Sequence, residues 1–339
     1  MTEVPARLPP RDSGDAWVEG PDGRRYWGRY GAAGLLVHDE AAGVLLQHRA
    51  EWSHFGGTWG LPGGARHAGE SAVAGAVREA GEEAGVPADA LEIAFTSTVD
   101  FGFWSYVTVV ARASRPFEAT IGDAESLELR WVPVAEVDAL PLHPGFGEAW
   151  PGLRARLGRR IRLVVDAANV VGSRPDGWWR DRAGAASRLL GRLDALSAAG
   201  VPVEALESAD ADLAGGRCWA GIVVVLEGQA RAAELPVLAA PTGGDGDAVA
   251  APDAPLAETV TEHPDGAAAM APALEIVRAP ASGDDTIVAV VESALAADAR
   301  GADRLLVITA DRELVQRVTA AGAETRGPGW LLEQLDALD

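Results

Sequence analysis

The sequence contains no lysine, so all 29 of its basic residues are arginine. Because alanine and glycine are abundant too, this absence indicates a GC-rich coding genome more than a function. The single cysteine, Cys218, excludes an intramolecular disulfide and is typical of a reducing, cytoplasmic compartment. No run of 18 apolar residues occurs, and the first residues are polar and proline-rich. We therefore expect a bacterial cytoplasmic protein with no signal peptide, no transmembrane helix and no membrane partner.

Acidic residues outnumber basic ones by 50 to 29, which gives a formal net charge of −21. Such a chain is a poor electrostatic match to a nucleic-acid backbone. It can still act on phosphates where bound metal ions reverse the local field. The length of 339 residues predicts two domains, and the 48% hydrophobic content is enough for packed cores.

The most informative stretch runs from Gly64 to Val86. It predicts a helix that begins near Ser71 and ends at Gly85. The glutamates of this helix are spaced i, i+3 and i+4, so they form one ridge. Close carboxylates raise one another's pKa, and a hard divalent cation such as Mg²⁺ or Mn²⁺ relieves the repulsion. The ridge consists of Glu79, Glu82 and Glu83.

A solvated acidic helix face is the alternative explanation for such a ridge. The residues around the ridge favour a metal site, because they follow the spacing G-x5-E-x7-R-E-U-x-E-E-x-G-U, where U is apolar. This spacing resembles the Nudix box, the signature of hydrolases that cleave nucleoside diphosphates linked to another moiety. The fixed positions are Gly64, Glu70, Arg78, Glu79, Glu82, Glu83 and Gly85.

The resemblance covers residues 16–155 and implies an α/β/α sandwich with a mixed sheet. It also implies that the carbonyl of Gly64 joins the three glutamates as a metal ligand. One carboxylate, Glu82, Glu83 or Glu128, would accept a proton from the attacking water, while Arg78 orients the ridge. Trp59 and Phe103 are candidates for the base pocket, although packing in the core is the commoner fate of such aromatic residues.

Residues 160–339 form a second predicted domain, in which apolar strands alternate with helices. This alternation predicts a doubly wound parallel sheet. The segment of about 236–272 is rich in alanine, proline, glycine and aspartate and predicts a flexible acidic insertion. Residues 1–15 predict a disordered lead-in.

Polar side chains follow the strands of this second domain. Ligands bind outside the carboxyl ends of strands in open α/β sheets, so these residues could hold one or two metal ions. Capping of the following helices is the alternative. These residues are Asp166, Asn169, Glu227, Asp284, Asp285 and Asp311. Their order along the chain resembles that of the NYN/PIN-like nuclease superfamily, whose members are metal-dependent ribonucleases or RNA-processing proteins.

The leading hypothesis is an Mg²⁺- or Mn²⁺-dependent Nudix pyrophosphohydrolase that cleaves the diphosphate of a nucleotide, coupled to a domain that cleaves or binds RNA. One alternative is a ribonuclease whose Nudix domain senses a nucleotide. Another is a non-catalytic RNA-binding regulator. The loops that select the leaving group lie outside the box, so the sequence leaves the nucleotide and the oligomeric state open.

Overall fold

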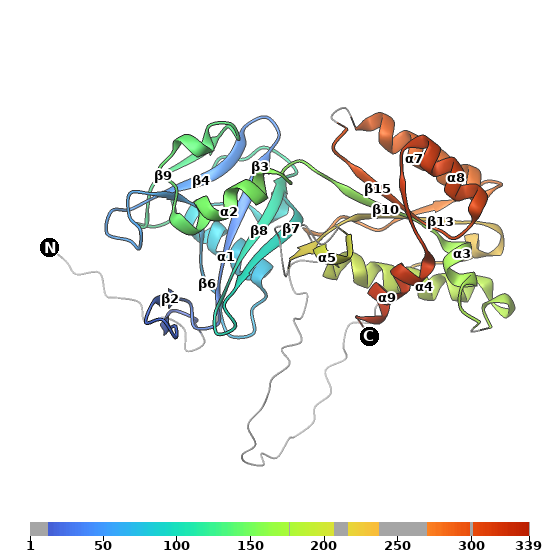
Figure 1. Ribbon diagram of the computed structural model, residues 1–339, viewed down its shortest axis with the longest axis horizontal. Helices are drawn as coiled ribbons and strands as arrows, with labels where there is room; N and C mark the ends of the chain where they lie inside the picture. The colour runs from blue at the N-terminus through green and yellow to red at the C-terminus, as the bar shows by residue number, and fades with distance from the viewer. Residues whose placement is uncertain (1–12, 176, 207–215, 237–269, 299–300, 339) are drawn as a thin grey trace, which may run out of the picture.

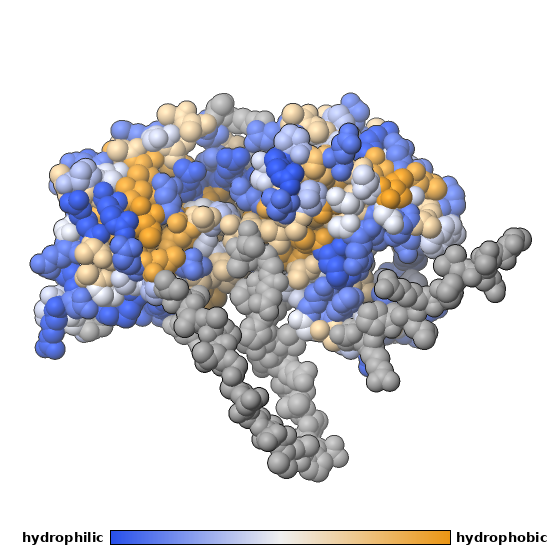
Figure 2. Space-filling view, turned by 180° about the vertical axis from the view of Figure 1, so that it is seen from behind, coloured by the Kyte–Doolittle hydropathy of each residue, from blue (hydrophilic) through white to orange (hydrophobic). Residues whose placement is uncertain are grey.

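The computed structural model describes residues 13–175, 177–206, 216–236, 270–298 and 301–338. Two sheets lie side by side, and each is covered by helices (Figure 1). On the face shown in Figure 2, strips of hydrophobic residues lie between hydrophilic ones. None of the helices in the described ranges is long and apolar enough to cross a membrane.

The first sheet is mixed. Its central strand, β3, pairs parallel with β8 and antiparallel with β4 and β6, while β9 and β5 extend the sheet beyond β4. A small separate hairpin precedes it. The strands of the sheet are β3 (Ala32–Asp39), β4 (Gly43–Arg49), β5 (Trp59–Gly60), β6 (Gly63–Ala65), β7 (Leu91–Asp100), β8 (Ser105–Ala113) and β9 (Ser126–Val132), and those of the hairpin are β1 (Trp17–Glu19) and β2 (Arg25–Trp27).

Helices cover both faces of this sheet. Successive residues of a strand point to opposite faces, so Leu35 packs towards α1 (Ala72–Ala84) and Leu36 packs towards α2 (Pro144–Arg154). Both leucines are fully buried. The predicted mixed α/β sandwich is therefore present. Two short 3₁₀ helices, Ala88–Ala90 and Val137–Ala139, complete this part of the chain.

The second sheet has five strands in the order β14-β13-β10-β15-β16, and every neighbouring pair is parallel. Hydrophobic clusters lie on both faces, so the predicted parallel sheet with helices on each side is confirmed. The strands are β10 (Ile161–Asp166), β13 (Gly221–Leu226), β14 (Glu275–Arg278), β15 (Arg304–Ile308) and β16 (Glu324–Arg326). One face carries α3 (Ala167–Gly172), α4 (Arg182–Ala199) and α9 (Pro328–Asp336), and the other α7 (Gly283–Ala297) and α8 (Arg312–Ala321). Further 3₁₀ helices are Trp178–Arg180 and Gly228–Ala232.

A hairpin from the second half of the chain joins the first sheet. Its strands β11 (Val201–Pro202) and β12 (Arg217–Cys218) flank α5 (Val203–Leu206), and Cys218 pairs with Phe95 of β7. Trp219, 6% exposed, packs into the core beneath α1. Residues of the range 160–339 therefore contribute to the sheet and to the core of the first predicted domain.

The two segments predicted to be flexible lie mostly outside the described residues, as the ranges 1–12 and 237–269. Their described ends make specific contacts. The carbonyl oxygen of Gly14 accepts a hydrogen bond from the Arg29 N–H at 2.8 Å. Met270 is 8% exposed and packs against the core beneath α1, and the Ser197 hydroxyl donates to the carbonyl oxygen of Pro272.

Candidate functional site

Helix α1 has the ends that the sequence predicts. The hydroxyl of Ser71 accepts a hydrogen bond from the Ala74 N–H and caps the first turn. Gly85 adopts a left-handed conformation with φ 63°, which ends the helix. The apolar side of the helix, including Ala76 and Ala80, is fully buried against the sheet. The glutamates of the ridge are therefore held at one edge of a fixed helix.

Arg78 binds three carboxylates of the box. Its Nε and Nη2 donate to the two oxygens of Glu70 at 2.8 and 2.9 Å, and its Nη1 donates to Glu79 at 2.8 Å. Nη1 also lies 3.5 Å from Oε2 of Glu82. The hydrogen bond to Glu70 raises the pKa of Arg78 further above its usual value. One guanidinium thus fixes the relative positions of these acidic side chains.

Among the described residues, neutral hydrogen-bond donors, and no arginine, hold Glu83 in place. Its side chain is 6% exposed, and its Oε2 accepts hydrogen bonds from the Gly63 N–H at 3.0 Å and from Gln47 Nε2 at 3.3 Å. In the described part of the chain no ion pair joins an arginine to it. Burial raises the pKa of Glu83 to about 8, and the nearby carboxylates of Glu79, Asp123 and Glu125 add to the increase. A bound cation would therefore stabilise the charged form of this carboxyl group.

Glu79 and Gly64 lie together beside it. Burial raises the pKa of Glu79, and the charges of Glu82 and Asp15 add to the shift, although Arg78 opposes it. A Cβ atom on Gly64 would lie 2.8 Å from the Glu79 carboxylate, so a larger residue at this position would displace that side chain. Gly64 therefore lies directly against the carboxylate of Glu79.

These residues fit a divalent cation. Across the described ranges, no group of three or more His, Cys, Asp or Glu side chains is arranged to hold a metal ion. Mg²⁺ needs fewer, because it takes one or two protein carboxylates and fills its octahedron with water and substrate phosphates. Two partly desolvated carboxylates, Glu79 and Glu83, supply oxygen donors of this kind.

Glu82 and Glu128, two of the predicted proton acceptors, lie on different elements and different sides of the sheet. The Glu82 side chain is 65% exposed at the surface of α1. Glu128 projects from the face of the sheet that α1 does not cover, because its neighbour Leu129 packs towards α1 and strand residues alternate. There its carboxylate lies 3.9 Å from Arg130. The structure therefore does not bring Glu128 to the carboxylates of the box.

Trp59 and Phe103, the aromatic candidates for the base pocket, lie in different parts of the first domain. Trp59 is 5% exposed, its ring is stacked on His48 at 4.8 Å, and the Arg130 guanidinium lies 4.3 Å from its centroid. A base could stack on Trp59 only after one of these groups moved. Phe103 is 39% exposed at the tip of the β7–β8 hairpin and packs edge-on against Tyr26.

Several residues that surround Glu83 are not predicted by the sequence. Gln47 is fully buried in β4 and Ser126 begins β9, and neither belongs to a motif. Asp123 and Glu125 lie in the loop before β9 and raise the pKa of Glu83. The acidic run before that strand is visible in the sequence, but the position of Gln47 depends on the packing of β4 against α1.

In the second sheet, Asp166 ends β10 as a buried carboxylate. Its oxygens accept hydrogen bonds from the Asn169 N–H at 3.0 Å and from the Thr309 hydroxyl at 2.9 Å. Burial raises the pKa of Asp166, and the charges of Asp284 and Glu227 add to the increase. These acidic groups are thus close enough to act on one another.

The remaining residues of that group are tied to the ends of helices. Glu227 accepts a hydrogen bond from the Gly283 N–H at 2.8 Å, and Asp311 caps α8. Asp285 forms an ion pair with Arg317 at 2.6 Å. Burial raises the pKa of Asp284, and Asp311 and Glu227 contribute. Asp311 therefore serves as a helix cap, and Asp285 is directed to Arg317.

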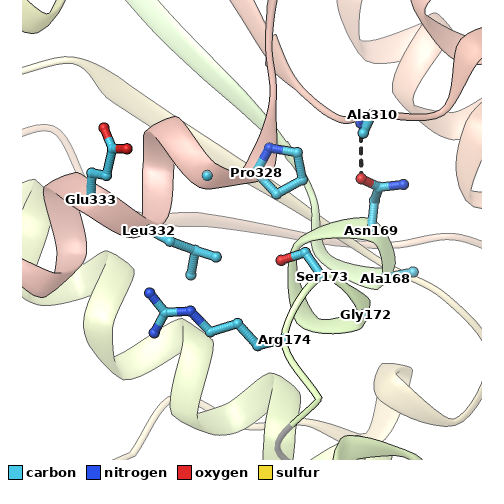
Figure 3. Close-up of a pocket in the computed structure, with 10 residues that line it drawn as sticks. Ala168, Asn169, Gly172, Ser173, Arg174, Ala310, Pro328, Leu332 and Glu333 are labelled. Carbon is cyan, nitrogen blue, oxygen red and sulfur yellow. Dashed lines mark hydrogen bonds between the residues drawn. The ribbon is translucent and has the colours of Figure 1, made fainter.

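A pocket of about 750 Å³ opens beside Asn169 (Figure 3). Asn169 accepts a hydrogen bond from the Ala310 N–H at 2.8 Å across one side, and Leu332 and Glu333 of α9 form the opposite wall. The chain leaves β10 towards β13 and leaves β15 towards β16, so the strand order reverses between β10 and β15. Ligands of open α/β sheets bind at such a reversal.

Comparison with known proteins identifies the family of the first half of the chain. The NUDIX domain family model matches residues 28–151. A Mycobacterium tuberculosis protein named "Putative 8-oxo-dGTP diphosphatase 3" is 53% identical over 154 residues, which cover 42% of this chain and 70% of that protein. A Bifidobacterium longum protein, named a nucleoside triphosphate pyrophosphatase/Nudix hydrolase fusion protein, is 41% identical over 162 residues, 44% of this chain and 34% of its own.

The crystal structure of RenU, a Nudix hydrolase from M. smegmatis, is 48% identical over 42% of this chain and 94% of its own, with a TM-score of 0.39. The chain belongs to the Nudix family. It is accordingly a hydrolase that acts on diphosphate bonds, and the family match lies within the half of the chain that carries the glutamate ridge.

Proposed function

We propose that the protein hydrolyses the diphosphate of an oxidised purine nucleoside triphosphate, of the 8-oxo-dGTP type, at a divalent cation. The observation that carries the chemistry is the buried Glu83, which has a raised pKa and no paired arginine in the described ranges. The proposed ligands are Glu79, Glu83 and the carbonyl oxygen of Gly64. The substrate class follows the name of the M. tuberculosis relative, which shares 53% of its residues with this chain over the matched region.

A divalent cation held by these residues would supply positive charge against the phosphate oxygens and would acidify a bound water molecule. Arg78 keeps the carboxylates of Glu70 and Glu79 in place, so that they need not reorganise when substrate binds. Glu82 has only a 3.5 Å contact to Arg78 and is 65% exposed, so it is free to accept the proton of the attacking water.

A panel of nucleotides tests the substrate. We expect 8-oxo-dGTP to be hydrolysed with a higher kcat/KM than dGTP, ADP-ribose, dinucleoside polyphosphates or capped RNA. Glu83→Gln is expected to lose at least about 100-fold of this activity, because removal of a ligand removes the cation. Glu118→Gln, an exposed carboxylate elsewhere on the surface, is the matched control and should leave it unchanged. A folded Glu83→Gln variant with full activity would contradict the proposed site.

We further propose that the second sheet binds single-stranded RNA beside Asp166, and cleaves it if the acidic residues there hold a metal ion. The observation that favours this is the pocket at the strand-order reversal, next to a buried carboxylate with a raised pKa. The protein is incubated with labelled single-stranded RNA and Mn²⁺. Cleavage that disappears in Asp166→Asn supports a nuclease, binding without cleavage supports a regulator, and absence of both rejects an RNA role.

A further inference from the structure

Gln47 is a fully buried polar residue in the middle of β4. It lies on the face of the sheet that α1 covers, together with Leu45, which packs in the core beneath that helix. Burying an amide costs free energy unless its polar atoms find hydrogen-bond partners. A leucine or valine would fill this strand position without that cost, so the contacts of the amide call for an explanation.

The amide nitrogen of Gln47 is directed at Glu83. One hydrogen bond runs from Nε2 to Glu83 Oε2 at 3.3 Å, and a second runs to the Ser126 hydroxyl at 2.8 Å. The NH₂ group has two hydrogens, so each acceptor takes one. The Gly63 N–H donates to the same Oε2 at 3.0 Å. Two neutral donors therefore fix one oxygen of the Glu83 carboxylate.

The other end of the amide lacks a partner. Gln47 Oε1 is buried, and no donor in the described part of the chain reaches it. Buried acceptors in folded proteins are nearly always hydrogen-bonded, to protein or to water. A donor from outside the chain, namely a water molecule held at the site, would satisfy it.

The contrast with Arg78 shows why a neutral residue suits this position. Arg78 carries a positive charge to Glu70 and Glu79 and pairs with both. An arginine at position 47 would place a second positive charge beside the proposed cation site, in addition to that of Arg78. A glutamine orients the carboxylate through an N–H group and leaves its negative charge available.

We propose that Gln47 is a positioning residue for diphosphate hydrolysis. Its Nε2 holds Oε2 of Glu83 so that the second carboxylate oxygen serves the cation, and its Oε1 accepts a hydrogen bond from a water molecule at the site. This inference rests on the proposed role of Glu83 as a ligand. It assigns to β4 a function that lies outside the glutamate ridge of α1.

The test measures Mn²⁺ binding by electron paramagnetic resonance, on the full-length protein without nucleotide. Gln47→Met keeps the length of the side chain and removes the donor, so we expect the Kd for Mn²⁺ to rise about tenfold or more. We expect kcat to fall with little change in KM, because the substrate does not contact position 47. Ser126→Ala keeps the Gln47–Glu83 hydrogen bond and is expected to change the Kd less than about threefold.

Thermal unfolding in EDTA shows whether each variant folds. If Gln47→Met does not fold, Gln47→Leu replaces it, since this change removes the N–H donor and adds no charge. A folded variant of either kind that binds Mn²⁺ as the wild type does would overturn the role of Gln47. Glu83→Gln distinguishes the role of Gln47 from that of Glu83. If Glu83→Gln also binds Mn²⁺ normally, the proposed ligand role of Glu83 fails. If Glu83→Gln loses Mn²⁺ binding and the Gln47 variants keep it, only the role of Gln47 is rejected.

Discussion

Arg78 and Glu70 form a two-pronged ion pair, with Nε and Nη2 of the guanidinium 2.8 and 2.9 Å from the two carboxylate oxygens. The third nitrogen of Arg78 reaches Glu79 at 2.8 Å. Glu70 therefore acts on the ridge indirectly, by fixing the arginine that fixes Glu79. The side chains of Arg78 and Glu70 are only 22% and 14% exposed, so solvent weakens this pair less than it weakens surface pairs.

Arg78→Lys tests this arrangement. A lysine ammonium is a point charge that cannot reproduce the fork, so Glu79 loses its fixed position. We expect the rate of nucleotide hydrolysis to fall about 10- to 100-fold with a small change in KM. Arg115→Lys is the matched control, because Arg115 contacts both oxygens of Asp89 on the exposed surface. Equal losses in the two variants would contradict a specific role of Arg78.

Glu83→Gln is expected to stabilise the metal-free protein at alkaline pH. The folded-state pKa of Glu83 is about 8, mainly because of burial, against 4.5 as its ordinary value. The folded state thus binds one proton more than the unfolded state between these values, so stability falls as pH rises from 4.5 towards 8. The wild type should lose roughly 3 kcal/mol relative to Glu83→Gln between pH 5 and pH 8 in EDTA.

Urea unfolding at the two pH values measures this difference. Glu82→Gln is the control, since Glu82 is 65% exposed, and it should follow the wild type. Adding Mn²⁺ at pH 8 should raise the stability of the wild type but not that of Glu83→Gln, because the ion binds the folded state. An equal pH response of wild type and Glu83→Gln would show that Glu83 titrates normally.

The sequence predicts the parts of the site that depend on one helix. Ser71 and Gly85 mark the ends of α1, and the i, i+3, i+4 spacing places the glutamates on one ridge. It does not predict contacts that depend on how strands align. Gln47 meets Glu83 only because β4 lies beneath α1, and the face occupied by Glu128 depends on its register with β4, which shifts between His48 and Arg49.

The same limit applies to the two sheets. Strand and helix alternation predicts a parallel second sheet, since each apolar run is short and followed by a helical pattern. The two-residue strand β12 has no such signal, and its pairing with β7 arises from tertiary packing between segments far apart in the chain. The pocket at Asn169 also depends on α9, which follows the last strand.

His143 is expected to make the protein sensitive to mild acid. Its pKa is lowered to about 4, mainly by burial, with smaller effects from Arg49 and His54. The unfolded state therefore binds more protons than the folded state between pH 4 and 6.5, and stability falls as pH falls through this window. After allowance for partial exposure of the ring, the wild type should lose roughly 1–2 kcal/mol more than His143→Gln between pH 7 and pH 5.

Thermal and urea unfolding at pH 5 and pH 7 give this difference between the two proteins. Comparing the changes with pH removes any loss of packing in His143→Gln that is independent of pH. The response is opposite in sign to that of Glu83, which destabilises the metal-free protein as pH rises. A wild type and a His143→Gln variant that lose the same stability on acidification would rule out an uncharged, buried His143.

Trp219 is expected to couple the two halves of the molecule. Its backbone N–H donates to Ala94 in β7 and its indole N–H donates to Ala198 in α4, while its ring packs in the core beneath α1. Trp219→Ala should lower the free energy of unfolding by about 3–5 kcal/mol through the cavity that it leaves. Trp52→Ala is the control, because Trp52 is 68% exposed, and it should stay within about 0.5 kcal/mol of the wild type.

Since β12 and Trp219 complete the first sheet, calorimetry of the wild type should show one transition, whereas Trp219→Ala should separate the unfolding of the two sheets. Two well-separated transitions in the wild type would mean that the junction does not couple them.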